Sequence, residues 1–518
     1  MLSLIARAGT SAPRIAIRDQ QGAHSYRRLL ESSAGIASRL LFDAPDLHEA
    51  RVAFLVPPGY WYAAVQWGIW RAGGIAVPLC LQHPRPELEY VVDDARVSVL
   101  VAHQDTADRV ADIAAARGLR LLIVPEGEEH PHPTPDTPHP TPASPVVQRL
   151  PEVEETRRAL ILYTSGTTGR PKGVVTTHAN IAAQVQSLVE AWEWSSDDHI
   201  LHVLPLHHIH GVVNVLTCAL WSGACCEFMP RFDAEAVWER FLDAPLTLFM
   251  AVPTIYVRLI AAWEAAEQPR QDALSAACRK FRLMVSGSAA LPVSTLDAWR
   301  DVSGHTLLER YGMTEIGMAL SNPLHDPRHP GCVGSPLPGV EVTLRDDDGG
   351  MPPDGVPGEI LVRGPGVFRE YWRRPEATAA AFTGGWFRTG DVAVREKGIY
   401  RILGRDSVDI LKTGGYKVSA LEIEETLREH PAVRECCVVG VPDPEWGERV
   451  GAAVVLQPGS SLDLPALRAW ARERLAVYKI PTRLLCLPEL PRSVIGKVTK
   501  PPVTLLFQST LEEGKRIA

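Results

Sequence analysis

The sequence predicts an α/β protein in which mainly parallel sheets flanked by helices are followed by a small α+β C-terminal domain. Two observations lead to this fold class. Short apolar runs at 51–56 and 74–80 enclose a helix-length segment at 58–72, and strand–helix–strand units of this kind build parallel sheets. After residue 404 the pattern changes to that of a separate compact unit. A length of 518 residues allows both units, at roughly 150 residues per domain.

The N-terminal part continues the same alternation. Apolar runs at 97–102 and 119–124 are predicted to be further strands, separated by helical segments. A proline-rich segment at 130–145 cannot pair in a sheet or continue a helix. We therefore expect an exposed loop there, with solvated histidines rather than metal ligands.

The C-terminal unit has its own succession of elements. A strand at 399–403 and a turn at 404–406 lead into it, and it contains an amphipathic helix at 420–430 ended by Pro431, strands at 433–441 and 450–456, and a helix near 465–474. The natural division is an N-terminal domain of residues 1–404 and a C-terminal domain of residues 405–518.

Charge and composition exclude several classes of protein. Lys and Arg number 53 against 61 Asp and Glu, a net charge of −8, so no overall positive field exists to attract nucleic acid. No apolar stretch approaches the ~18 residues of a membrane helix. The nine Cys include the adjacent pairs 225–226 and 436–437 in apolar runs, which indicates buried reduced thiols. No obligate protein partner is evident.

The N-terminal segment bears on the location of the protein. Arg7, Arg14 and Arg18 precede the first acidic residue, Asp19, in a faint resemblance to a transit peptide. The apolar run at 15–17 already has the pattern of a folded domain. We expect a cytoplasmic protein, with a mitochondrial location as the alternative.

The densest chemical signal lies at 163–173, with the sequence YTSGTTGRPKG. Three glycines, four Ser or Thr residues and two cations suit a loop whose N–H groups and hydroxyls surround a polyphosphate. It is not a Walker A loop, because Pro171 precedes the lysine and the following Gly-Val-Val favours a strand. An ordinary Gly/Ser/Thr turn is the alternative for such a window.

This string resembles the phosphate loop of the adenylate-forming superfamily, which includes acyl-CoA synthetases, peptide-synthetase adenylation domains and beetle luciferases. Four further segments in the same order also match motifs of the family. They are RYGMTE at 310–315, WFRTGD at 386–391, Gly404-Arg405, and PRSVIGK at 491–497. The resemblance covers nearly the whole chain and implies a small barrel-like β region in the N-terminal part and a mobile C-terminal domain.

The resemblance also implies roles for particular residues. ATP-binding residues would be Thr164, Ser165, Gly166, Thr167, Thr168, Gly169, Arg170, Pro171, Lys172, Tyr311, Thr314, Asp391 and Arg405. Catalytic residues would be Lys497, Glu315, Thr167 and His208, with Glu315 also binding Mg²⁺. Attack of a carboxylate on the α-phosphorus brings two anions together, so a lysine, Mg²⁺ and aligned dipoles are the groups that this reaction needs.

In this superfamily the small domain is taken to reorient between adenylation and thioester formation. Lys412, Gly414 and Gly415 belong to a glycine loop that matches the thioester-forming loop, where CoA is the second substrate. The hinge is expected at Ser407 or Val408, although a simple β-turn also explains that segment.

The choice of acid depends on Arg258. It lies in an apolar segment that starts like a helix at Pro253, so it either reaches water or faces an anion inside. Segments 281–292, 307–323 and 407–417 are most similar to malonyl-CoA synthetases, in which a cation at this position is taken to bind the carboxylate that does not react. We therefore expect a buried Arg258.

Other residues have weaker claims to the acid pocket. Arg310 is a second cation of the same region, and Ser286 is a further candidate lining residue, although a tight turn also explains the Ser-Gly-Ser sequence around it. The segment 204–211 resembles the family's Pro-x-aromatic-His motif, with His207 at the aromatic position and His208 as the histidine of the motif. Three histidines within 207–210 lack a Cys or acidic cluster nearby, so metal is not expected.

The resulting expectation is an ATP-dependent malonate–CoA ligase that forms malonyl-AMP and pyrophosphate, then malonyl-CoA and AMP. Methylmalonate is expected to be a weaker substrate, since one methyl group changes discrimination by about 1–3 kcal/mol. Two alternatives remain. One is a medium-chain or aryl acyl-CoA synthetase with Arg258 turned to solvent, and the other is a catalytically silent nucleotide-binding protein of the same fold.

Overall fold

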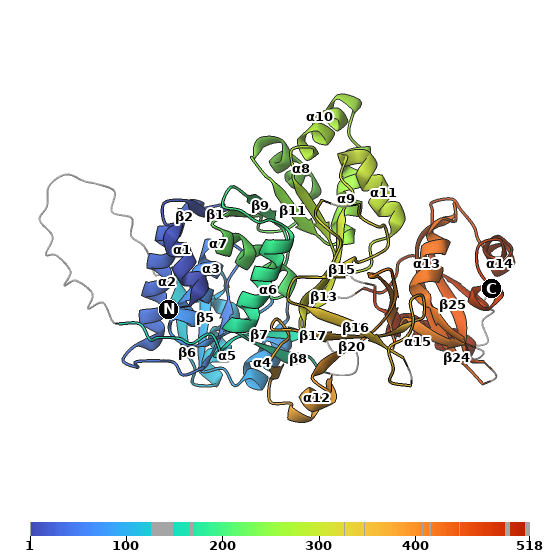
Figure 1. The fold of residues 1–518 in the computed structure, drawn as a ribbon. Helices are drawn as coiled ribbons and strands as arrows, with labels where there is room; N and C mark the ends of the chain where they lie inside the picture. Colours follow the sequence, from blue (N-terminus) through green and yellow to red (C-terminus); the bar gives the residue numbers. More distant parts are fainter. Residues whose placement is uncertain are drawn as a thin grey trace, which may run out of the picture.

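A computed structural model describes residues 2–125, 149–164, 170–325, 327–346, 348–406, 408–413, 416–444, 446–492 and 498–512. Four sheets organise them, three formed before residue 406 and one after residue 409. Figure 1 shows the last sheet with α13 and α14 at one end of the molecule, away from the N-terminal helices. The predicted α/β fold class with a small C-terminal α+β unit is confirmed. The proline-rich segment at 130–145 lies outside the described residues.

A seven-stranded sheet carries the segments on either side of the phosphate-loop motif. Its strands are, in spatial order, β18 (Glu370–Tyr371), β8 (Lys172–Thr177), β7 (Arg158–Thr164), β4 (Ile75–Pro78), β3 (Arg51–Leu55), β5 (Val99–His103) and β6 (Arg120–Val124). From β7 to β6 all neighbours are parallel. The strands predicted from their short apolar runs are therefore present, and β8 begins at Lys172 as the Gly-Val-Val sequence indicates.

A nine-stranded sheet carries the segments predicted to hold the acid and part of the ATP. Its order is β15 (Ser335–Pro336), β14 (Gly317–Ser321), β13 (Leu308–Met313), β12 (Leu283–Ser286), β11 (Leu248–Ala251), β9 (His199–His202), β10 (Cys225–Phe228), β1 (Ile15–Asp19) and β2 (Gly22–Ser25). The strands from β13 to β1 are parallel. Their carboxyl ends therefore meet at one edge, where open α/β sheets bind ligands.

Two smaller sheets complete the described chain. The third consists of β16 (Glu341–Arg345), β17 (Gly358–Arg363), β20 (Trp386–Glu396), β19 (Phe382–Thr383) and β21 (Ile399–Arg405), all antiparallel, and stands where the barrel-like β region is expected. The C-terminal sheet consists of β23 (Tyr416–Ser419), β22 (Ile410–Thr413), β25 (Gly447–Leu456), β24 (Val433–Asp443) and β26 (Arg483–Cys486). The sheet thus changes between Arg405 and Ile410, next to the predicted domain boundary.

The helices cover these sheets. Those of the N-terminal part are α1 (Ser3–Thr10), α2 (Tyr26–Leu41), α3 (Tyr60–Arg71), α4 (Arg85–Ala95), α5 (Asp108–Ala116), α6 (His178–Ala191), α7 (Cys218–Ser222), α8 (Ala234–Asp243), α9 (Pro253–Glu264), α10 (Gln268–Cys278), α11 (Val293–Ser303) and α12 (Pro375–Ala380). The C-terminal part has α13 (Ala420–Arg428), α14 (Leu464–Arg472) and α15 (Lys500–Glu512). Short 3₁₀ turns lie at Gln104–Thr106 and Val477–Lys479.

The main core lies between the two large sheets. Helix α3 buries nearly all of its residues, and side chains from both sheets belong to the same hydrophobic cluster. A helix that is apolar on every side is stable only when it is enclosed in this way. The core thereby fixes the two sheet edges relative to each other.

The structure also accounts for the N-terminal segment and the cysteines. Helix α1 buries Leu4 and Ile5, and Arg7 Nε donates to the Trp221 carbonyl at 3.1 Å, so this segment packs on the domain. All nine cysteines are unpaired thiols, and burial raises the pKa of Cys436 to about 12. Within the described ranges, none of the helices has the length and apolar character to cross a bilayer.

Candidate active site

A cavity of about 4200 Å³ opens where the sheet edges meet the C-terminal unit. It is lined by most of the described candidate residues. These are Thr164, Arg170, Pro171, Lys172, His208, Arg258, Ser286, Arg310, Tyr311, Thr314, Glu315, Asp391, Arg405 and Lys412. Residues separated by up to 248 positions in the sequence therefore share one cavity.

The candidate nucleotide residues form a hydrogen-bonded group at one side of this cavity. The Tyr311 hydroxyl donates to Asp391 Oδ2 at 2.5 Å, and Arg405 Nε donates to Asp391 Oδ1 at 3.1 Å. Burial raises the pKa of Tyr311 well above its ordinary value, so the side chain stays a neutral donor. The Asp391 amide donates to Thr389 Oγ1 at 3.0 Å, which fixes the backbone of β20 next to Asp391. A carboxylate held in this way can accept hydrogen bonds from the hydroxyl groups of a sugar.

Glu315 lies in the turn that follows β13, next to Thr314. Its side chain is buried, and the Tyr371 hydroxyl donates to Glu315 Oε1 at 2.9 Å. Burial raises the pKa of this carboxyl above its ordinary range. Lys172 Nζ lies 5.2 Å from the centre of the Tyr371 ring, so the lysine and the glutamate face the same aromatic side chain.

These residues fit a magnesium–phosphate group. Mg²⁺ in proteins is commonly held by one or two carboxylates together with substrate phosphates. Glu315 is one such carboxylate at the cavity wall. In the described part of the chain, no cluster of three or more His, Cys, Asp or Glu side chains forms a complete metal site.

Arg310 is a buried cation on the wall of the cavity. Its side chain is only 4% exposed, and its Nε is buried without a hydrogen-bond partner among the described residues. Arg310 Nη2 donates to Ser288 Oγ at 3.3 Å. Burial lowers the pKa of Arg310 to about 9, so it is still a cation at pH 7. A guanidinium that is buried without an acidic partner favours an anionic ligand.

Close packing fixes this guanidinium. A Cβ added to Gly287 would lie 2.5 Å from Arg310 Cζ, so the guanidinium lies directly against the Gly287 backbone. Ser288 follows in the left-handed region, with φ of 68°. Its Oγ also lies 3.1 Å from His210 Nδ1, which places His210 and Arg310 on the same serine. Ser286, at the end of β12, is buried beside them.

Arg258 has a different environment from the expected one. Helix α9 begins at Pro253 as predicted, but it buries Ile255, Tyr256, Leu259 and Ile260, so the helical period places Arg258 on the opposite, exposed side. The expectation of a buried Arg258 is therefore wrong. Its Cζ lies 4.9 Å from the centre of the Phe232 ring, on the cavity wall. A role of Arg258 in acid binding stays a prediction.

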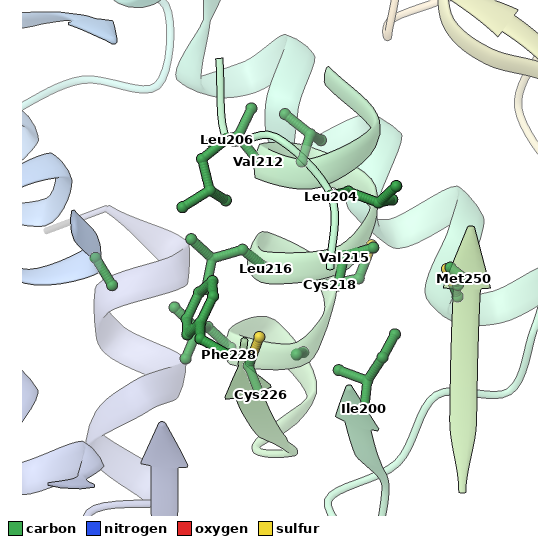
Figure 2. Close-up of a cluster of buried hydrophobic side chains, with 14 of the residues drawn as sticks. Ile200, Leu204, Leu206, Val212, Val215, Leu216, Cys218, Cys226, Phe228 and Met250 are labelled. Atoms are coloured by element: carbon green, nitrogen blue, oxygen red, sulfur yellow. The ribbon is translucent and has the colours of Figure 1, made fainter. Parts of the chain in front are cut away.

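The histidine segment is held between two anchored ends. Leu204 and Leu206 precede it, and the π-helix at His210–Thr217 follows it. Figure 2 shows Leu204 and Leu206 in one apolar cluster with Val212, Val215 and Leu216. The His207 and His208 rings lie 4.2 Å apart, and burial lowers the pKa of His207 to about 3. π-Helical segments are rare and are frequently found at functional sites.

Several candidates have no described position. The residues at 165–169, Ser407, Gly414, Gly415 and Lys497 lie outside the described residues. Their flanks are described: Thr164 and Lys172 are paired in the ladder between β7 and β8, and Val408 donates its N–H to the Arg405 carbonyl at 3.1 Å. Lys412 is exposed on β22 and its N–H donates to Glu448 Oε2.

Other residues of this region also contact the predicted residues. Tyr371 and Thr389 are not recognisable from their local sequence, whereas Ser288 is a candidate as the second serine of the Ser-Gly-Ser sequence. A hydroxyl that bonds to a residue tens of positions away leaves no local signal. His210 was visible only as the third histidine of its segment.

Comparison with known proteins follows the same division of the chain. The model of the AMP-binding enzyme family matches residues 5–372, and that of the AMP-binding enzyme C-terminal domain matches residues 422–497. The chain belongs to the AMP-binding enzyme family. It is therefore related to enzymes throughout its length, and the resemblance on which the motif assignments depend is confirmed.

Individual relatives cover nearly the whole chain. It is 49% identical to the mitochondrial malonate–CoA ligase of Mus musculus, over 95% of this chain and 88% of that protein. It is 42% identical to the malonate–CoA ligase of Arabidopsis thaliana, over 95% and 86%. Among solved structures, ATP-bound MatB from Rhodopseudomonas palustris is 32% identical and superposes with a TM-score of 0.85, over 98% of this chain and 99% of that one.

Proposed function

We propose that this protein is an ATP-dependent malonate–CoA ligase. The single observation that carries the choice of acid is the buried guanidinium of Arg310, which has no acidic partner among the described residues and lies on the same cavity as the nucleotide group. The relatives named as malonate–CoA ligases support the same reaction. A second carboxylate on a short acid is the ligand that matches this charge.

In the first step a malonate carboxylate oxygen attacks the α-phosphorus of ATP, and the bond to the pyrophosphate oxygen breaks. Asp391 accepts from the ribose hydroxyls, with Arg405 and Tyr311 fixing its carboxylate. Lys172 and Arg170 lie at the end of the phosphate segment, and Lys497 is the cation assigned to the α-phosphate. These positive groups offset the charge that builds up as two anions meet. Thr167 and His208 remain the other catalytic candidates.

Mg²⁺ belongs to this proposal. When bound, it neutralises charge on the phosphates, as in other phosphoryl and nucleotidyl transfers. Glu315 would hold it, with its carboxylate oriented by the Tyr371 hydroxyl.

In the second step the CoA thiol attacks the carbonyl carbon of malonyl-AMP. The bond to the AMP oxygen breaks, the thiol proton leaves to solvent, and malonyl-CoA and AMP are released. We assign residues 1–404 to an N-terminal domain and 405–518 to a mobile C-terminal domain, with the pivot at Ser407 or Val408. Lys412, Gly414 and Gly415 then form the loop that approaches the thioester.

Selectivity follows from the charge at Arg310. When a monocarboxylic acid binds, the buried guanidinium stays unpaired. The free-energy cost is several kcal/mol, about the cost of removing one partner from a buried ion pair. Arg258, on the exposed side of α9, is assigned to the entrance of the acid site. Methylmalonate differs by one methyl group, so it is expected to be a weaker substrate.

The direct test is pyrophosphate release with malonate, acetate and octanoate as acids. Malonate should give the highest kcat/KM by at least about 100-fold, which corresponds to roughly 3 kcal/mol. Equal or greater turnover with a monocarboxylate would remove the diacid assignment and favour a medium-chain or aryl acyl-CoA synthetase, the alternative that the exposed Arg258 allows. No turnover with any acid would favour a silent nucleotide-binding protein.

The location is a further part of the proposal. The name of the mouse relative describes that protein as mitochondrial, which supports the mitochondrial alternative over the cytoplasmic one. Fractionation of the host cell, with detection of the protein in each fraction, decides between the two.

A further inference from the structure

Helix α4 lies against both ends of the phosphate segment. Tyr90 and Asp94 are one helical turn apart and therefore lie on the same face of α4. The Tyr90 hydroxyl donates to the Pro171 carbonyl at 2.7 Å, and the Tyr163 hydroxyl donates to Asp94 Oδ2 at 2.9 Å. Tyr163 lies near the end of β7, and Pro171 directly precedes β8. One face of α4 thus holds the two strands that enclose the glycine loop.

The contact to Pro171 lies between two cations. Proline has no N–H, so its carbonyl is the backbone group through which this position can be anchored. Arg170 precedes it and Lys172 follows it, and Arg170 Cζ also lies 5.8 Å from the centre of the Tyr90 ring. The Tyr90 side chain therefore holds the backbone of Pro171, the residue that lies between the two cations.

Asp94, the second residue of this face of α4, is itself held by two further hydrogen bonds. Arg374 Nη2 donates to Asp94 Oδ1 at 2.6 Å, and Trp372 Nε1 donates to the Asp94 carbonyl at 3.1 Å. The Tyr90 and Tyr163 rings meet edge to face, with centroids 6.2 Å apart. Tyr90 consequently has a well-defined position relative to β7, and its hydroxyl is not an isolated surface contact.

We propose that Tyr90 is a positioning residue for the adenylation step, which orients Arg170 and Lys172 toward the phosphates of ATP through its bond to the Pro171 carbonyl. The inference rests on the proposed function in assigning ATP phosphates to this segment. Tyr90 does not touch the reacting atoms. Its effect is expected on ATP use and not on the later attack of CoA, because the pyrophosphate has left by then.

The test is Tyr90→Phe, which removes the hydroxyl and keeps the ring. Loss of a single neutral hydrogen bond corresponds to about a 3- to 10-fold effect. We expect KM for ATP in pyrophosphate release to rise by about that factor, with melting temperature near that of the wild type. Thioester formation from synthetic malonyl-AMP and CoA should stay at the wild-type rate. Tyr163→Phe, which removes the bond to Asp94, should change ATP use in the same direction.

The matched control is Tyr400→Phe. Tyr400 also donates to a backbone carbonyl, that of Val342 at 3.1 Å, but in the third sheet. This variant should keep the wild-type KM for ATP. The inference is overturned if Tyr90→Phe leaves KM for ATP unchanged, or if both half-reactions fall equally. The ATP measurement can use whichever acid the wild-type protein adenylates, so failure of the malonate assignment is a separate outcome.

Discussion

Replacing Arg310 by Gln removes a buried positive charge from the acid side of the cavity and keeps a polar side chain. In the wild-type chain this guanidinium is 4% exposed, and the hydrogen bond described for it goes to Ser288 Oγ, a neutral group. A bound carboxylate would therefore supply its main counter-charge. Removing one member of a buried ion pair costs about 3–5 kcal/mol, which corresponds to a loss of about 10²-fold to a few times 10³-fold in kcat/KM for malonate.

The assay is pyrophosphate release at varied malonate and, in parallel, at varied acetate. Arg310→Gln should lower kcat/KM for malonate by about 10²-fold to a few times 10³-fold and change that for acetate far less. KM for ATP should stay near the wild-type value. The ratio of kcat/KM for malonate to kcat/KM for acetate should therefore decrease strongly.

Arg328→Gln is the matched control. Arg328 is a half-buried arginine whose guanidinium donates to the backbone carbonyls of Thr306, Pro323 and Leu324. Its loss should reduce stability without changing the preference between acids. An equal loss of malonate and acetate turnover in Arg310→Gln would refute the reasoning, because it would mean that Arg310 supports the fold or the nucleotide.

Three further predictions follow from other contacts. Asp391→Asn weakens the bonds from Tyr311 and Arg405, and KM for ATP should rise by about 10- to 100-fold, as expected for hydrogen bonds to a charged group of about 1.5–3 kcal/mol; an unchanged KM would contradict this. Burial raises the pKa of Glu309 to about 8. Because the folded-state pKa lies above the unfolded one, the stability linked to this proton is present below about pH 4.3 and is lost as pH rises through 8. Glu309→Gln should therefore raise the melting temperature at pH 9 relative to wild type and have little effect at pH 5; the same shift at both pH values would contradict it. Glu425 Oε1 accepts from the Val293 N–H at 2.8 Å, at the start of α11, which has no side-chain cap of its own. Glu425→Ala should lower the stability of the protein by about 1 kcal/mol of lost capping, seen as a lower melting temperature; an unchanged melting temperature would contradict it.

The architecture was accessible from local patterns. Apolar runs such as 51–56 and 119–124 carry their own strand signal, because a buried parallel strand is apolar on both faces. The start of α9 at Pro253 and the end of α13 before Pro431 likewise depend on the residues at those positions. The pairing order of the sheets was not accessible, since it depends on contacts between strands far apart in the sequence.

The site was only partly accessible for the same reason. Motifs located Tyr311, Asp391 and Arg405, which the fold brings within hydrogen-bond distance. Burial was not predictable from the motifs. Arg258 lies in an apolar segment but on its exposed side, whereas Arg310 becomes buried because the Gly287 backbone packs against its guanidinium. The bond between Tyr90 and Pro171 spans 81 positions and has no signature in either segment.

The most direct test compares malonate with its monomethyl ester as acid substrates of the wild-type protein. The two differ mainly in the charge at the end that does not react, so size is nearly held constant. A buried cation at that end predicts a preference for malonate of about 100-fold or more in kcat/KM. Comparable kcat/KM values for the diacid and the ester would contradict selection by charge.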